Sequence, residues 1–323
     1  MLRFNKNIAV SLGDPSGIGT EVFIKAISET DLKNSLDQIT IFSDPIVIEN
    51  MLERLSINIE INLLSKEQSN KQNCFNTVIA EKCDKYILGS PSSDNASYIL
   101  SNLEAASKFA NDNNANLVTG PINKSVISSV FSNFSGHTDF LKKQFLCEEV
   151  LMVLSNPKLR VGLVTTHIPH AKVHKSISVD KIVKKGILFA NGLQQNFGIS
   201  HPKICVLSLN PHSGEQGLIG DEEIEIISPA VDMLCNKNVN AFGPLPADTA
   251  FLRNEFDGFL SMYHDQGLPV VKTVDFHRTI NSTLGLPFLR TSVDHGTAED
   301  IADKLIANHQ SMLEAIKVAG NVH

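Results

Sequence analysis

Short apolar runs alternate along the chain with longer stretches in which apolar positions recur at helical spacing. The runs predict strands at residues 7–12, 38–43, 150–155, 160–166, 203–209 and 258–263. The helical spacing predicts helices at residues 20–29, 45–55, 95–112, 179–195, 222–234 and 298–314. This alternation of strands and helices predicts an α/β architecture with a largely parallel or mixed sheet.

Length and charge narrow the class of protein. The 323 residues are enough for two domains of ordinary size, and without a Pro/Ser-rich linker we expect the chain to cross between them more than once. The formal net charge of -7 argues against a nucleic-acid partner. No uncharged apolar stretch reaches the ~18 residues of a membrane span, and the N-terminal apolar run is too short for a secretory signal.

The cysteines indicate a compartment rather than a metal site. The five cysteines are scattered, odd in number and without a CxxC pair: Cys74, Cys83, Cys147, Cys205 and Cys235. Reduced thiols in a cytoplasmic protein are the simplest interpretation, and a zinc-thiolate site is disfavoured.

Polar and glycine residues gather in five stretches that follow or interrupt apolar runs: "GDPSGIGTE", "TGPINK", "SGHTDF", "LNPHSGEQG" and "YHDQGLP". Any one of them could be an ordinary turn. Five in one α/β chain indicate a site, because functional polar groups concentrate in loops held by a rigid scaffold.

Three strand-like runs each finish in a histidine, namely His167, His212 and His264. Neutral imidazole suits a divalent transition metal, and three such ligands leave positions for substrate or water. Their wide spacing is not a local motif, so hydrogen-bonded structural histidines are the alternative. His201, His309 and His323 lack such a context and are expected on the surface.

A second group of polar residues suits an anionic substrate. Lys272, Asn281 and Arg290 could supply two cations and an amide to a phosphate or carboxylate. His137 and Thr138 add donors from another part of the chain. The alternative is that Lys272 and Arg290 are exposed surface charges.

These motifs together resemble the 4-hydroxythreonine-4-phosphate dehydrogenase family of pyridoxal 5'-phosphate biosynthesis. The resemblance runs from about residue 8 to residue 302, and the motifs follow in the family's order: "GDPSGIGTE", "TGPINK", "GHTDF", "LNPHSGE", "GPLPADTAF", "YHDQGLPVVK" and "TLGLPFLRTSVDHGTA". The chain departs from the family's usual residues at Asp139, Ser213, Gln216 and Asp303. None of these positions is a matched ligand, but they leave room for a shifted substrate preference.

The resemblance implies two α/β/α domains with an active-site cleft between them, as in the isocitrate and isopropylmalate dehydrogenases. We place the first domain at residues 1–130 plus 265–323 and the second, with the metal ligands and dimer contacts, at 131–264. It also implies a homodimer with the site at the subunit interface, and one divalent ion (zinc, magnesium or cobalt) on His167, His212 and His264. Substrate contacts carry over to His137, Thr138, Lys272, Asn281 and Arg290, and Asp265 is expected to support the loop or orient a ligand.

Cofactor binding needs a separate argument, because the chain contains no G-x-G-x-x-G motif. "DHGTAEDIA" instead resembles the adenosine-binding loop of the isocitrate and isopropylmalate dehydrogenases. We therefore place part of an NAD or NADP site on Gly296, Thr297 and Asp300.

The implied reaction is oxidation of 4-phosphohydroxy-L-threonine to a β-keto acid, which loses carbon dioxide to give 3-amino-2-oxopropyl phosphate. Asp248 and Lys272 are the candidates for accepting the hydroxyl proton. Relatives that act on phosphorylated threonate or erythronate share much of the pattern. A metal-dependent phosphohydrolase or a non-catalytic phosphate-binding protein would explain part of it.

Overall fold

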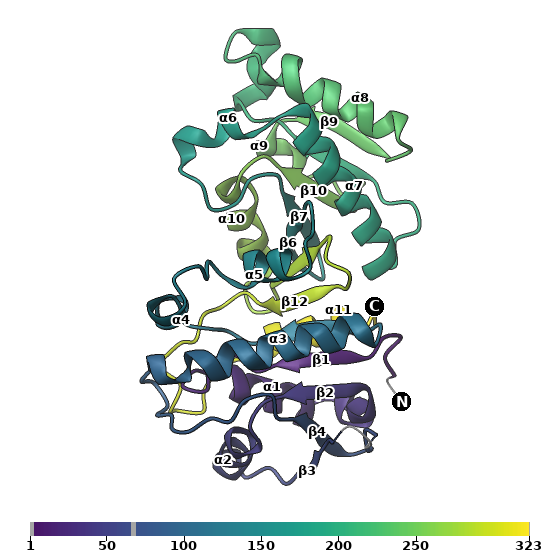
Figure 1. Ribbon diagram of the computed structural model, residues 1–323. Helices are drawn as coiled ribbons and strands as arrows, with labels where there is room; N and C mark the ends of the chain where they lie inside the picture. Colours follow the sequence, from purple (N-terminus) through teal and green to yellow (C-terminus); the bar gives the residue numbers. More distant parts are fainter. Residues whose placement is uncertain (1–2, 66–68, 323) are drawn as a thin grey trace. The chain divides into compact units, whose positions relative to one another are not determined.

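The chain folds into two compact units, and it passes from the first to the second and back again. A computed structural model describes residues 3–65 and 69–322 (Figure 1). The first unit comprises Met1–Leu146 and Leu286–His323, and the second comprises Cys147–Gly285. Each unit contributes six of the described strands and has its own apolar core.

The division lies at different residues from those that we placed by sequence. Residues 131–146 group with the first unit and residues 265–285 with the second. The second assignment follows from strand pairing, because strand β11 (Ile280–Leu284) pairs along its length with strand β6 (Leu151–Asn156) of the second unit. A strand belongs to the sheet that satisfies its backbone hydrogen bonds.

In the described part of the first unit, six strands form a sheet in which every neighbouring pair is parallel. The order is β3 (Glu60–Leu63), β4 (Cys74–Val78), β2 (Ile39–Phe42), β1 (Ile8–Ser11), β5 (Asn116–Thr119) and β12 (Arg290–Val293). The central strands are buried at every position, as expected where helices cover both faces of a parallel sheet.

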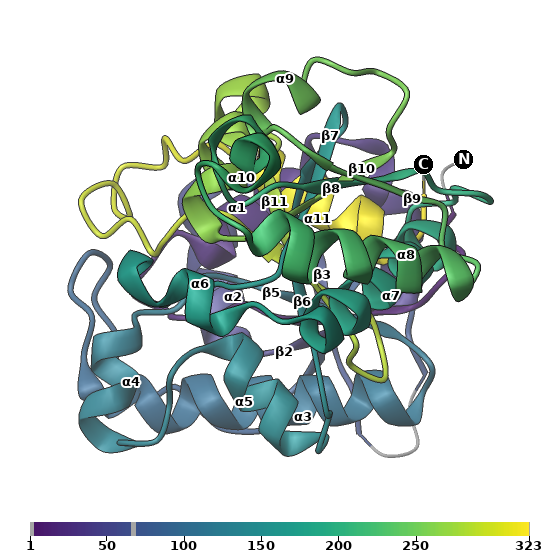
Figure 2. The same cartoon turned by 90° about the horizontal axis from the view of Figure 1, so that it is seen from above.

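Helices cover this sheet on both sides. Helix α3 (Ala96–Asp112) lies on one face, and helices α1 (Gly19–Ser28) and α11 (Gln310–Ala319) lie on the other (Figures 1 and 2). The apolar side of α3 packs Leu103, Ala106 and Ala110 against the strands. The remaining helices of this unit are η1 (Asp31–Gln38), α2 (Pro45–Leu55), η2 (Ser93–Asn95), α4 (Lys124–Val130) and α5 (His137–Gln144).

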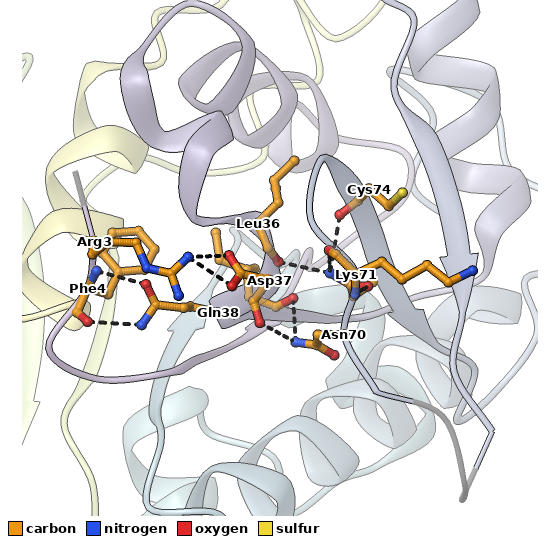
Figure 3. A network of polar contacts seen from close by, with 10 residues as sticks. Arg3, Phe4, Leu36, Asp37, Gln38, Asn70, Lys71 and Cys74 are labelled. Atoms are coloured by element: carbon orange, nitrogen blue, oxygen red, sulfur yellow. Dashed lines mark hydrogen bonds and ion pairs between the residues drawn. The ribbon is translucent and has the colours of Figure 1, made fainter. Parts of the chain in front are cut away.

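A polar network joins the N-terminal segment, η1 and the start of β4 (Figure 3). Arg3 Nη1 lies 2.7 Å from Asp37 Oδ1, and the side chain of Gln38 exchanges two hydrogen bonds with the backbone of Phe4. Asn76 is fully buried, and its amide nitrogen donates to Leu36 O at 2.9 Å. This network explains how β4, with the polar sequence "CFNTV", becomes an interior strand that the apolar pattern did not predict.

The second unit contains a mixed sheet. Its described strands follow the order β11 (Ile280–Leu284), β6 (Leu151–Asn156), β7 (Leu159–Leu163), β10 (Gly258–Ser261), β8 (Ile204–Leu207) and β9 (Ala241–Leu245). β11, β6 and β7 pair antiparallel. β7, β10, β8 and β9 pair parallel, so their carboxyl ends lie along one edge.

Two helices cover opposite faces of this sheet. A Cβ at Gly267 of α10 (His264–Asp275) would lie 2.5 Å from Val161, and a Cβ at Gly162 would lie 3.4 Å from Phe189 of α7 (Val179–Asn196). Successive residues of a strand point to opposite faces, so α10 and α7 are on different sides. The other helical segments are η3 (His170–Lys172), α6 (Val173–Ser176), η4 (Pro211–Gly217), η5 (Glu223–Ile227), α8 (Ser228–Asn236) and α9 (Ala247–Ala250).

The expected α/β class and the predicted strands are confirmed, but one helix was predicted wrongly and several were missed, among them α4, α5 and α10. The predicted helix at 298–314 is instead a series of turns that leads to α11, because Ala298 and Leu305 have left-handed backbone angles (φ 48° and 57°). The strand before His264 does end where expected, and α10 follows it and contains Pro269. No helix within residues 3–65 and 69–322 is long and apolar enough to cross a membrane.

Candidate functional site

Four predicted site residues of the second unit follow neighbouring parallel strands. His167 comes after β7, His264 after β10, His212 after β8 and Asp248 after β9. The strands end three to five residues before these side chains, so the histidines belong to loops and helix starts rather than to the strands. Ligands of open α/β sheets bind beyond the carboxyl ends of parallel strands. We call this row the carboxyl edge of the second unit.

His167 and His264 lie side by side on this edge. Their ring centroids are 5.6 Å apart. His264 is the first residue of α10, and its Nδ1 lies 2.6 Å from Asp265 Oδ1. A carboxylate in this position holds the imidazole with Nδ1–H as donor and leaves Nε2 as the ligating nitrogen. Asp265 therefore has the contact expected of an orienting residue.

The strand ends that carry His264 and His212 are connected by one glutamine. Gln266 accepts a hydrogen bond from Met262 N at 2.8 Å, and its amide nitrogen donates to Ser208 O at 2.6 Å. Met262 follows β10 and Ser208 follows β8. The bridge fixes the two loop starts relative to each other.

His212 begins a loop with an unusual backbone. Its φ is 51°, and left-handed angles continue through Gln216. Each non-glycine residue in such a conformation costs roughly 1 kcal/mol or more. The buried carboxylate of Glu223 holds the loop start by accepting hydrogen bonds from Leu209 N and Asn210 N, both at 2.7 Å. Strain of this kind is typical of functional segments, so we interpret the loop as part of the predicted site.

The predicted three-histidine site is not assembled within this chain. In the described ranges, 3–65 and 69–322, no group of three or more His, Cys, Asp or Glu side chains lies close enough to hold a metal ion. Two of the three histidines are neighbours, and His167 and His212 are exposed. The metal site stays a prediction.

The other predicted residues of the second unit lie on α9, α10 and β11. Lys272 is half-buried, eight residues after His264 on α10, with Nζ 5.9 Å from the centroid of the Phe276 ring. Asn281 is half-buried in β11, where it pairs with Leu154. Asp248 is exposed on α9. Lys272 is thus on the same helix as a predicted metal ligand.

The first unit has a corresponding edge, formed by loops after β1, β5 and β12. These three strands are parallel neighbours. Asp14 N donates to Pro121 O at 3.0 Å, and Ile18 N donates to Thr297 O at 3.1 Å, so the three loops are hydrogen-bonded to one another. A Cβ at Gly120 would lie 2.1 Å from Leu12 O, which shows how closely the backbones approach. We call these interlocked loops the carboxyl edge of the first unit.

A buried carboxylate lies within this edge. Asp14 is 1 % exposed, and its Oδ1 accepts a hydrogen bond from Ser16 N at 2.9 Å. Burial raises the pKa of Asp14 above its ordinary value, the charge of Glu299 adds to the rise, and the hydrogen bonds from Ser16 oppose it. Its carboxylate therefore ionises at a higher pH than an exposed one.

The predicted cofactor residues are on the third loop of this edge. Thr297 is buried and donates to Glu299 Oε1 at 2.6 Å, and the same oxygen accepts from Asn123 Nδ2 at 2.9 Å. The hydrogen bond from Thr297 is the main cause that lowers the pKa of Glu299. Gly296 and Asp300 are exposed. The loop is thus held by Thr297 and Glu299, while Gly296 and Asp300 face solvent.

The predicted anion-binding residues of the first unit form a separate group. Arg290 is 4 % exposed, and its Nε and Nη2 donate to Thr119 Oγ1 at 3.0 and 2.7 Å. Burial lowers the pKa of Arg290 to about 9. His137 and Thr138 begin α5. Burial, together with the positive charges of Arg290 and Lys124, keeps the pKa of His137 well below its ordinary value.

The structure therefore divides the predicted site between the two units. His137, Thr138, Arg290, Gly296, Thr297 and Asp300 belong to the first unit, and His167, His212, Asp248, His264, Lys272 and Asn281 belong to the second. Of the other histidines, His201 is exposed, His309 Nδ1 lies 3.7 Å from Glu29 Oε2, and His323 is outside the described residues.

Sequence reasoning missed several residues that organise these edges, namely Asp14, Asn123, Lys124, Glu223 and Glu299. Asp14, Asn123 and Lys124 occur in stretches that the sequence analysis had marked, "GDPSGIGTE" and "TGPINK". The signal was present, but nothing in the sequence says which side chain of a glycine-rich loop is buried. Glu223 lies in a predicted helix, where a carboxylate is ordinary.

The fold and the two edges define a two-unit α/β protein that gathers its polar groups at the carboxyl ends of parallel strands. An isocitrate dehydrogenase from Methylococcus capsulatus has a related fold, with a TM-score of 0.51 at 12% identity over 99% of this chain and 85% of that chain. A crystal structure of 4-hydroxythreonine-4-phosphate dehydrogenase from Klebsiella pneumoniae is more similar, with a TM-score of 0.86 at 32% identity over 98% of each chain.

The sequence comparisons are more specific. A 4-hydroxythreonine-4-phosphate dehydrogenase from Pseudoalteromonas translucida is 40% identical over 97% of both chains. The family model described as pyridoxal phosphate biosynthetic protein PdxA matches residues 35–319. The chain belongs to this family, and the predicted resemblance is confirmed. It is an oxidoreductase of pyridoxal phosphate biosynthesis.

Proposed function

We propose that the protein oxidises 4-phosphohydroxy-L-threonine with NAD and a divalent metal ion, as its similarity to the named dehydrogenases suggests. The observation that supports this most strongly is the row of three histidines after three neighbouring parallel strands. Imidazole ligands in a row at a strand edge suit a metal that binds a substrate hydroxyl. Bound NAD would accept the hydride from the hydroxyl carbon, and the β-keto acid that results would lose carbon dioxide to give 3-amino-2-oxopropyl phosphate.

The residues present fit the metal that this reaction requires. His167, His212 and His264 would hold a zinc, cobalt or magnesium ion, and their nitrogen ligands suit the first two best. The contact of His264 Nδ1 with Asp265 would leave Nε2 as the nitrogen that binds an ion. When bound, the ion supplies polarisation of the substrate hydroxyl. Among the described residues of one chain, no group of three or more possible ligands lies close enough to hold an ion, and a site completed by a second subunit would account for this.

We assign the remaining predicted residues to the substrate, to the cofactor or to proton transfer. Arg290, His137 and Thr138 in the first unit, with Lys272 and Asn281 in the second, bind the anionic ends of the substrate. Gly296 and Thr297 would support the adenosine part of NAD or NADP, and the exposed carboxylate of Asp300 could accept a hydrogen bond from a ribose hydroxyl. Asp248 and Lys272 are the candidates for taking the hydroxyl proton.

One assay tests the reaction. Incubation with 4-phosphohydroxy-L-threonine, NAD and a divalent metal should raise the absorbance at 340 nm, and a chelator should abolish the rise. Phosphorylated threonate and erythronate, tested in parallel, show which related substrate is preferred. Release of inorganic phosphate without NAD reduction would identify a phosphohydrolase, and neither change would indicate a non-catalytic binding protein.

A mixing experiment tests the shared site. We propose a homodimer, so an inactive Lys272→Ala chain mixed with an inactive His167→Ala chain should regain activity if the two residues serve one site from different subunits. Light scattering on the parent protein is the control. A fully active monomer would refute the shared site.

We also place the protein in the cytoplasm. All five cysteines lie in the described part of the chain as thiols rather than disulfides, and Cys74, Cys83 and Cys205 are buried. Burial raises the pKa of Cys83 and Cys205 to about 12, which leaves these thiols unreactive. Fractionation of cells that express a tagged chain would test the location.

A further inference from the structure

Lys124 occupies a position that helix stability does not favour. It is the first residue of α4, whose N-cap Asn123 accepts hydrogen bonds from Ser125 N at 3.1 Å and Val126 N at 3.3 Å. The N-terminus of a helix carries partial positive charge, so a cation in the first turn costs about 0.3–1 kcal/mol. Lys124 is also exposed, so it contributes no core packing. Its charge therefore needs another explanation.

The side chain of Lys124 extends to the start of the next helix. Its Cε and Nζ lie 3.3 and 3.5 Å from the point where a Cβ at Gly136 would be. Gly136 is the N-cap residue of α5, has a φ of 134°, and is followed by His137 and Thr138. The ammonium group thus lies beside two residues that we assign to substrate binding. Both helices belong to the first unit.

Arg290 is a second cation that influences His137 at the start of α5. Arg290 donates to Thr119 Oγ1, five residues before Lys124 on the segment that leads from β5 into α4. The charges of Arg290 and Lys124 both depress the pKa of His137, so both are close enough to interact with its ring. Of the acidic groups on α5, Asp139 is exposed and accepts a hydrogen bond from Ser135 Oγ at 2.7 Å. Two cations and a neutral imidazole converge on one region of a chain whose net charge is -7.

We propose that Lys124 is a further binding residue for the phosphate group of the substrate, together with Arg290 and the start of α5. A phosphate monoester carries close to two negative charges at neutral pH. The guanidinium of Arg290 is held in place by Thr119 and supplies a fixed positive charge, and the ammonium group of Lys124 supplies a second charge that a flexible stem can bring to the phosphate oxygens. A phosphate thus uses both kinds of cation, whereas a single carboxylate would be satisfied by Arg290.

Direct binding of inorganic phosphate tests this proposal without turnover. Calorimetric titration of the full chain should show phosphate binding that falls about ten-fold or more in Lys124→Met and recovers largely in Lys124→Arg. Lys143→Met is the matched control, because Lys143 is an exposed lysine in the last turn of α5. Thermal melting should show no loss of Tm in any variant, with at most a small rise in Lys124→Met. A parent protein that binds no phosphate, or a Lys124→Met variant that binds as tightly as the parent, overturns the assignment.

A kinetic experiment rests on the proposed function, and its outcome is independent of the phosphate titration. In Lys124→Met the KM for 4-phosphohydroxy-L-threonine should rise about ten- to a hundred-fold, and the KM for NAD should change less than about two-fold. Calorimetry with 4-hydroxy-L-threonine, which lacks the phosphate, distinguishes the phosphate from the carboxylate. Equal losses of affinity for both compounds would assign Lys124 to the carboxylate and overturn the proposal. An enzyme that is inactive with this substrate would refute the proposed function and leave the phosphate titration valid.

Discussion

The carboxyl edges of the two units are built in different ways. In the first unit the loops after β1, β5 and β12 are hydrogen-bonded to one another, and Asp14 and Thr297 are buried within them. In the second unit His167, His212 and Asp248 are exposed, while Glu223 and Gln266, which hold the segments before His212 and His264, are hydrogen-bonded into the fold. The first edge is preorganised by packing, and the second presents its side chains outward.

This difference predicts how each edge responds to substitution. Closely packed backbone has no room for added atoms, so changes in the first edge should mainly reduce the free energy of unfolding. Exposed side chains contribute little to stability, so changes in the second should mainly reduce turnover. The predictions below test this distinction, from the largest expected effect to the smallest.

His212→Ala should abolish turnover while leaving cooperative unfolding intact. Loss of residues that merely support a metal ligand typically costs 10–100-fold, so loss of a ligand should cost at least about 100-fold. Activity, metal stoichiometry and the melting curve are measured together. His201→Ala is the matched control, an exposed histidine of the same unit. If His212→Ala kept its metal and a near-normal rate, the assignment of His212 as a metal ligand would be wrong.

Gly120→Ala should produce the opposite result, a loss of stability. The new Cβ would lie 2.1 Å from Leu12 O and cannot be relieved by a side-chain rotation, so we expect about 3 kcal/mol of destabilisation. Gly296→Ala is the control on the same edge, because nothing lies within 4 Å of the added Cβ. Chemical denaturation of both variants measures the effect. Equal stability of the two would contradict the interlocked-loop description.

Arg290→Lys should weaken substrate binding more than cofactor binding. Lysine cannot reproduce the two hydrogen bonds that Nε and Nη2 make to Thr119 Oγ1, and it offers a point charge in place of a fork. The loss of about 1.5–3 kcal/mol corresponds to roughly ten- to a hundred-fold in the KM of the substrate. Lys272→Met provides the comparison from the second unit. A larger effect on NAD than on substrate in either variant would show that the cations serve the other ligand.

Asp14→Asn should show the smallest effect, visible as a trend with pH. The raised pKa means that the folded protein holds the proton of Asp14 more tightly than the unfolded chain does, whose pKa is about 3.9. Ionisation therefore destabilises the fold as the pH rises from about 4 through the folded pKa. Asparagine carries no charge and keeps an oxygen for Ser16 N. The stability of the variant relative to the parent should rise over this range and then level off.

Urea denaturation of both proteins between about pH 4 and pH 8 checks this trend. A difference that does not change with pH would mean that Asp14 is not the titrating group. A difference that falls with rising pH would mean that the charged carboxylate is favoured by its surroundings, contrary to the pKa direction.

Sequence patterns predicted regular elements well where the buried residues form a clear apolar run or recur at helical spacing, and they missed the fully buried but partly polar strands β5 and β12. The strands at β1, β2, β6, β7, β8 and β10 are apolar runs, and helices α1, α2, α3 and α7 carry their apolar residues at helical spacing. The pattern failed for β4, where the buried amide of Asn76 replaces an apolar residue, and for residues 298–309, where left-handed angles at Ala298 and Leu305 interrupt a helical spacing. The spacing of apolar residues indicates which side chains are buried. It contains no information on which hydrogen-bond partner a buried polar group finds.

The sequence by itself determined the α/β class, the family, and the loops in which polar residues gather, because these depend on residue type and order. Only the tertiary structure decided that the strands before His167, His264 and His212 are parallel neighbours, and that Asp14 is buried among three loops far apart in the chain. It also placed Lys124 beside Gly136 and the start of α5. Strand order and burial arise from contacts between distant segments, and the free energy of those contacts depends on the whole fold rather than on any local pattern.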